Sequence, residues 1–110
     1  MEFNNPEPKT KEELELNFAS NDVDLIAESL VSLSLYEKDW YWAQNICLYF
    51  LDSDNPIISG LAATSLGHIA RIHHNLDKQK VLLALEQKVN DPAIRGRVQD
   101  ALDDIEIYSQ

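Results

Sequence analysis

The sequence has 110 residues, 45% of them hydrophobic and 25% charged, which excludes an intrinsically disordered chain and leaves room for only one hydrophobic core. Nineteen acidic residues against nine basic ones give a formal net charge of -10, which would repel a phosphate backbone and argues against direct nucleic-acid binding. The charge serves either solubility or the electrostatic attraction of a basic partner.

Cysteine content and hydropathy indicate the compartment. Cys47 is the single cysteine, so an intrachain disulfide is excluded and a buried structural thiol is expected. The first residues lack the basic start and apolar run of a signal peptide, and no apolar stretch approaches the roughly 20 residues that span a bilayer. We therefore expect a cytoplasmic protein with no membrane contact.

The N-terminal third predicts an arm followed by two helices. Residues 1–10 are polar and contain two prolines, so we expect a flexible arm at 1–10 and a single helical-repeat domain at 11–110. Thr10 and Glu13 have the spacing of a capping box, which predicts a short helix after Thr10. After the interruption at 21–22, apolar residues at helical spacing predict a second helix from Val23 to about Leu35.

Four further helices are predicted along the rest of the chain. Asp39 caps the third, which the polar run 52–56 ends, and Pro56 suits the first turn of the fourth. The fourth ends near 73–75, with Asn75 in a left-handed cap conformation. Asp77 opens the fifth, whose apolar stripe reaches Val89, and residues 90–92 separate it from the sixth. No segment alternates with period two for long, so no strand is predicted.

A 36-residue offset superposes the chain on itself. It pairs Pro56 with Pro92, Ile58 with Ile94, Gly60 with Gly96, Leu66 with Leu102 and Ile69 with Ile105. The same shift backwards indicates a degenerate first copy. A period of this length is typical of helix pairs that bury their apolar faces only by stacking on their neighbours. The sequence thus predicts an all-α fold, a short α-solenoid of about three helix pairs.

Two stretches resemble HEAT repeats, and the resemblance covers the chain from Trp40 onwards. The matching residues are Asp54, Pro56, Leu61, Ala62, Ala63, Leu66 and Gly67 in 51–73, and Asp91, Pro92, Arg95, Ala101 and Leu102 in 89–105. The arginine that the family often carries after the turn is present as Arg95, whereas the corresponding position is Ser59. The runs 61–73 and 100–105 are similar to small bacterial HEAT-like proteins that resemble the immunity proteins of contact-dependent growth-inhibition (CDI) systems. This resemblance implies an α-α superhelix that binds and neutralises a cognate toxin domain.

The offset also predicts a polar surface, since positions one repeat apart lie side by side in a solenoid. It groups Glu28, Thr64 and Asp100 in one row and Ser32, His68 and Asp104 in the next, away from the expected core positions Leu66 and Leu102. Arg71, Gln99 and Asp103 complete a mainly acidic face. Such a face is either ordinary solvated helix surface or the surface that meets a partner.

Three consecutive aromatic residues at 40–42 cannot all face one apolar stripe. Trp40 matches the core stripe of its helix, while Tyr41 or Trp42 lies either across a repeat junction or at an interface as an anchor.

Catalytic and metal-binding patterns are absent from the sequence. Adjacent His73 and His74 diverge on a helix, no zinc-ligand spacing occurs, and neither a phosphate-binding glycine loop nor a nucleophile turn is present. We expect no enzyme activity, no metal and no cofactor.

Charge and resemblance together favour an immunity-type protein whose acidic helical face binds a basic toxin domain, in particular a nuclease. The candidate partner-binding residues are Glu28, Trp42, Thr64, His68, Arg71, Gln99, Asp100, Asp103 and Asp104. The alternative is a general HEAT-like scaffold or adaptor, and a third class is a small enzyme accessory protein or lyase. The sequence leaves open whether the chain is a monomer or a dimer.

Overall fold

The chain is described by a computed structural model that places residues 6–109, and within this range it forms helices and no strand. The helices are α1 (Lys11–Phe18), α2 (Val23–Tyr36), α3 (Trp40–Leu51), α4 (Pro56–His73), α5 (Lys78–Glu86) and α6 (Arg95–Tyr108). The prediction of an all-helical chain is confirmed. None of these helices combines the length and apolarity needed to cross a membrane.

Local capping sets the start of most helices. Thr10 and Glu13 form the predicted capping box at the start of α1. The side chains that accept backbone N–H groups at the next four helix starts are Asp22, Asp39, Asn55 and Asp77. Because these contacts join residues only two or three apart, they are readable from sequence.

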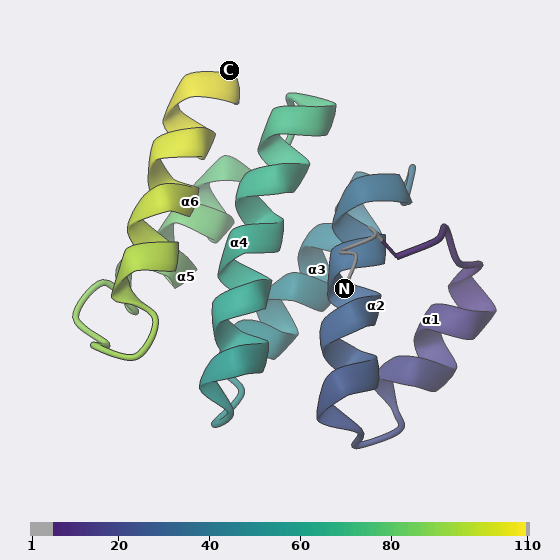
Figure 1. The fold of residues 1–110 in the computed structure, drawn as a ribbon. Coiled ribbons are helices and arrows are strands. Elements are labelled where there is room, and N and C mark those ends of the chain that lie inside the picture. Colours follow the sequence, from purple (N-terminus) through teal and green to yellow (C-terminus); the bar gives the residue numbers. More distant parts are fainter. Residues whose placement is uncertain (1–5, 110) are drawn as a thin grey trace, which may run out of the picture.

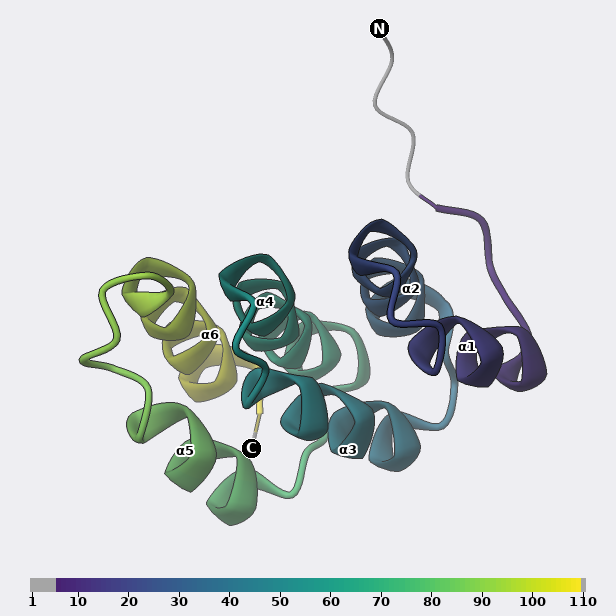
Figure 2. The same ribbon diagram turned by 90° about the horizontal axis from the view of Figure 1, so that it is seen from below.

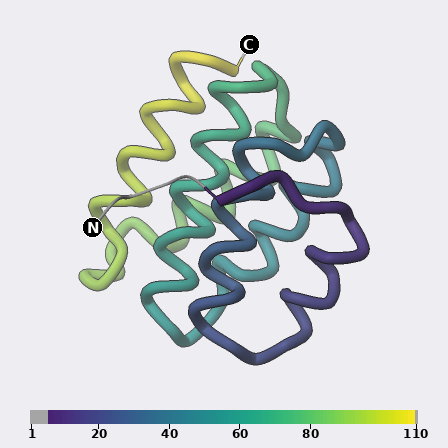
Figure 3. The backbone as a smooth tube through the Cα atoms, turned by 45° about the vertical axis from the view of Figure 1, so that its right-hand side comes forward, coloured from purple at the N-terminus to yellow at the C-terminus, as the bar shows by residue number. Residues whose placement is uncertain are grey.

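The helices lie in two layers. Helices α2, α4 and α6 lie side by side in one layer, and α1, α3 and α5 form the other (Figures 1 and 2). Successive helices alternate between the two layers, so that each hairpin contains one helix of each layer. The chain trace shows how one hairpin leads into the next (Figure 3). Helix α4 is central, since it packs against α2, α3 and α6, and the inward residues of α4 join one continuous core, including Ala62, Leu66 and Ile69.

Two predictions near the helix ends were wrong, and one expected core residue is less buried than predicted. Helix α5 ends at Glu86, and α6 begins only at Arg95, with no side-chain cap at Ile94. His74, with φ of 53°, takes the left-handed conformation expected of Asn75; its ring Nδ1 lies 3.1 Å from the Tyr108 carbonyl oxygen. Leu102 is half-buried rather than fully in the core, since α6 lies at the end of its layer (Figure 1).

Residues 6–10 lie against α2. The backbone carbonyl of Glu7 accepts a 2.9 Å hydrogen bond from Ser32 Oγ, and Lys9 Nζ is 3.4 Å from a carboxylate oxygen of Glu28. Ser32 is therefore only 1% exposed, which corrects its predicted place on the open polar face. Residues 1–5 of the predicted arm lie outside the described range.

Candidate functional site

A close approach of α4 and α6 creates the candidate site. A Cβ atom on Gly67 would lie 3.1 Å from Asp104 Oδ2 and 3.2 Å from Ala101 Cα, both closer than ordinary van der Waals contact. Two turns earlier on α4, a Cβ atom on Gly60 would lie 2.8 Å from Arg97 Cδ. The two glycines thus let α6 settle directly against α4.

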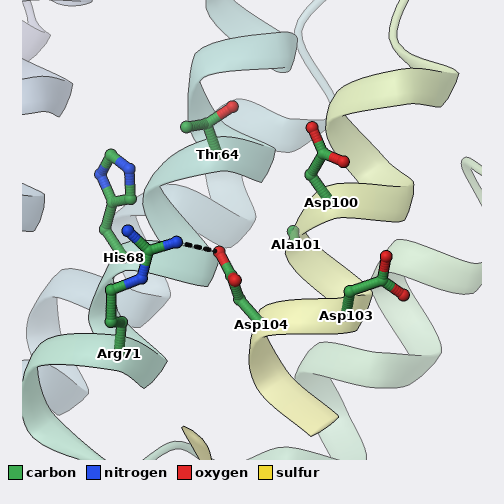
Figure 4. Close-up of a pocket in the computed structure, with 7 residues that line it drawn as sticks. All are labelled: Thr64, His68, Arg71, Asp100, Ala101, Asp103 and Asp104. Atoms are coloured by element: carbon green, nitrogen blue, oxygen red, sulfur yellow. Dashed lines mark hydrogen bonds and ion pairs between the residues drawn. The ribbon is translucent and has the colours of Figure 1, made fainter. Parts of the chain in front are cut away.

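An open pocket of about 370 Å³ lies over this contact (Figure 4). Helix α4 contributes Thr64, His68 and Arg71, and α6 contributes Asp100, Ala101, Asp103 and Asp104. We call this surface the α4–α6 pocket. Six of the nine candidate residues line it, because the 36-residue offset places the two helices in matching register.

One ion pair joins α4 to α6 across the pocket. Arg71 Nη2 is 3.0 Å from Asp104 Oδ2, as Figure 4 shows. The same guanidinium lies 5.6 Å from the centre of the Tyr108 ring. Arg71 thereby neutralises one of the three pocket carboxylates and is itself held on two sides.

The other two carboxylates remain available. Asp103 accepts a 3.1 Å hydrogen bond from the amide of Gln99, one turn earlier on α6. Asp100 forms no hydrogen bond or ion pair with another side chain of residues 6–109, and both aspartates are exposed. With three carboxylates against one guanidinium, the pocket keeps a negative charge.

His68 lies at the α2 side of the pocket. Its Nδ1 is 3.4 Å from Ser34 Oγ on α2. Burial and the nearby charge of Arg71 lower the pKa of His68, against the opposing effect of Asp104. The ring is therefore biased towards its neutral form, which both donates and accepts hydrogen bonds.

The sequence analysis missed Arg97. Its Nη1 donates a 3.0 Å hydrogen bond to Thr64 Oγ1, while its aliphatic stem crosses Gly60. A second cation therefore stands at the edge of the pocket. The sequence signal for this contact was Gly60, 36 residues before Gly96. A glycine at this position leaves room for a long side chain to cross α4.

Three candidates lie outside the pocket. Gln99 acts on it through Asp103. Glu28 lies on α2 and pairs with Lys9, which precedes α1. Trp42 is half-buried in the other layer, where Lys11 Nζ lies 4.9 Å from its ring centre. Trp42 thus spans the junction between α1 and α3, the structural alternative considered for it.

Two further kinds of site are relevant to the side chains of residues 6–109, namely a metal site and a nucleophilic cysteine. In residues 6–109, no three His, Cys, Asp or Glu side chains are arranged to hold a metal. Cys47 is fully buried, and burial raises the pKa of its thiol to about 12. Since the thiolate is the reactive form, Cys47 is unsuited to act as a nucleophile.

Comparison with solved structures identifies a full-length neighbour. One chain of the crystal structure of a CDI complex from Cupriavidus taiwanensis LMG 19424 superposes with a TM-score of 0.90 and 29% sequence identity. The match covers 100% of this chain and 99% of the other. No protein-family model and no curated protein matches the sequence. The match confirms the resemblance to proteins of CDI systems that the two HEAT-like stretches indicated.

Proposed function

We propose that this protein is an immunity-type inhibitor that binds and neutralises a cognate toxin domain. The observation that carries the proposal is the similarity, over the full length of both chains, to a component of a CDI complex. In this proposal the pairs α1–α2, α3–α4 and α5–α6 are three HEAT-like repeats of a short α-solenoid, and the protein acts by binding rather than by catalysis.

The α4–α6 pocket is the proposed docking surface. It supplies Asp100 and Asp103 as exposed carboxylates, while Arg71 and Arg97 are held within the chain by Asp104 and Thr64. With a net charge of -10, the chain attracts a basic domain from a distance. A nuclease is a basic toxin of this kind, because its own substrate is a polyanion.

Two steps would follow from docking. The pocket aspartates pair with lysine or arginine side chains of the toxin that otherwise contact phosphates, and the body of the inhibitor then occupies the path of the nucleic acid. Inhibition would be competitive with nucleic acid, and the inhibitor itself would bind none.

The proposal predicts a toxin gene immediately upstream of this one, and it is tested by expressing the chain together with the toxin domain that such a gene encodes. We expect a stable complex on size-exclusion chromatography and loss of nucleic-acid cleavage at equimolar inhibitor. A complex that forms while cleavage continues would favour the alternative role as an adaptor. Failure of the two proteins to associate at micromolar concentration would overturn the proposal.

A further inference from the structure

A second hollow surface lies between α1 and α3. Two open pockets, of about 370 and 240 Å³, adjoin each other at Tyr49 and Phe50, which line both. We call the two together the α1–α3 groove. Its lining residues come from α1, α3, the segments that follow these two helices and the N-terminal ends of α2 and α4: Glu15, Phe18, Ala19, Asn21, Val23, Ile26, Ile46, Tyr49, Phe50, Asp52, Ser53 and Ile58.

Aromatic rings form the centre of the groove. The ring centres of Phe18 and Phe50 are 5.2 Å apart, and those of Tyr49 and Phe50 are 5.0 Å apart with an edge-on arrangement. Phe50 is nearly buried, whereas Tyr49 is 74% exposed. A tyrosine held by its neighbours and open to solvent can gain much buried area on binding at little entropic cost.

The charges along the groove are of one sign. Its charged lining residues are Glu15 and Asp52, and no lysine or arginine lines it. One basic group, Lys88, contacts a lining residue, since its Nζ lies 3.1 Å from Asp52 Oδ1. Asp52 is paired with Lys88 but its side chain stays 77% exposed. The groove is thus an apolar floor with an acidic rim.

We propose that the α1–α3 groove binds a basic amphipathic helix of a second protein. Two helices with an apolar seam between them are the usual walls of a helix-binding groove, and the acidic rim complements lysines or arginines beside an apolar stripe. A second copy of this chain does not fit as well, since two chains of net charge -10 repel each other.

The groove is separate from the α4–α6 pocket. The two surfaces share no lining residue: those of the pocket lie on α4 and α6 from Thr64 onwards, whereas the groove is lined by residues 15–58. Both surfaces can therefore be occupied at once, and occupancy of the groove does not depend on the proposed immunity function.

The test uses a synthetic peptide of about 18 residues with leucine on one helical face and lysine on the other. It is titrated into the ¹⁵N-labelled protein, and backbone amide shifts are followed by NMR. We expect the largest shifts at Glu15, Phe18, Tyr49 and Asp52, and no binding of a peptide in which glutamate replaces every lysine. Tyr49→Ala should weaken binding about tenfold or more.

Tyr41→Ala is the matched control, because Tyr41 is also an exposed tyrosine of α3 (53%) but lies outside the groove. It should change binding less than twofold. Equal losses in the two variants, or shifts confined to Asp100, Asp103 and Asp104, would overturn the proposal. So would a dimer in sedimentation equilibrium that Tyr49→Ala dissociates, because the groove would then be a self-association surface.

Discussion

Arg71 on α4 and Asp104 on α6 are joined by an ion pair of 3.0 Å that spans the proposed docking pocket. The two side chains are 51% and 21% exposed, and exposed ion pairs contribute about 0–1 kcal/mol to stability. The pair therefore matters more for the charge that the pocket presents than for holding the two helices together.

Arg71→Ala should separate these two effects. We expect the free energy of unfolding to fall by no more than about 1 kcal/mol in urea titrations. Association with a basic toxin domain should become faster, because removing the guanidinium leaves Asp104 unpaired and the pocket more negative. Slower association in stopped-flow measurements would instead assign Arg71 a direct contact with the partner.

Gly67 and Gly96 provide a matched pair for the packing of α4 against α6. A Cβ atom at Gly67 meets the backbone of Ala101 at 3.2 Å, whereas one at Gly96 meets nothing within 4 Å. Alanine is favoured over glycine in a helix by about 1 kcal/mol, while forcing atoms into a packed contact costs about 1–3 kcal/mol. Chemical denaturation should therefore find Gly96→Ala more stable than the parent and Gly67→Ala at least about 1 kcal/mol less stable than Gly96→Ala. Equal stabilities would mean that α6 moves away freely.

Gln44 joins α3 to the start of α5. Its side chain is fully buried, and its Oε1 accepts a 2.7 Å hydrogen bond from the backbone N–H of Asp77. Gln44→Leu leaves that donor without its partner, which should lower the free energy of unfolding by about 1–3 kcal/mol. Gln79→Leu, on the exposed side of α5, should change it by less than about 0.5 kcal/mol. Similar thermal denaturation of the two variants would contradict the assigned role.

His68 should make stability depend on pH. Burial and Arg71 lower the pKa of the folded His68 below its ordinary value of 6.5, so the unfolded chain binds the proton more tightly. The free energy of unfolding therefore has its full contribution from neutral His68 above about pH 6.5, and this contribution is lost as the pH falls below that value. Urea titrations at pH 7.5 and 5.0 should show a smaller loss for His68→Gln than for the parent. Identical losses would place the pH dependence elsewhere.

Short-range signals explain what the sequence could predict. The capped starts of α1, α2, α3, α4 and α5 were readable because each cap joins neighbours in the chain. The start of α6 was not, since Ile94 offers no side-chain acceptor. The 36-residue offset placed Thr64 beside Asp100 and His68 beside Asp104, and in the structure these four residues of α4 and α6 line one pocket.

The features that the sequence could not predict depend on contacts between residues far apart in the chain. The burial of Ser32 depends on the carbonyl of Glu7, 25 residues earlier, and the position of Arg97 depends on the space above Gly60. The apolar periodicity of α2 and of α6 indicates neither of these two contacts. Trp42 was ambiguous for the same reason, because only the position of Lys11 places it at the junction of α1 and α3.

The central claim is most directly tested by the rate of association with the upstream-encoded toxin domain, measured by stopped flow over a range of salt concentrations. We compare a variant carrying Asp100→Lys, Asp103→Lys and Asp104→Lys with a control of equal net charge carrying Asp24→Lys, Asp54→Lys and Glu86→Lys, whose parent side chains are exposed outside the pocket. The account predicts that the pocket variant associates at least about tenfold more slowly than the control and loses most of the salt dependence. Equal rates for the two variants would contradict it.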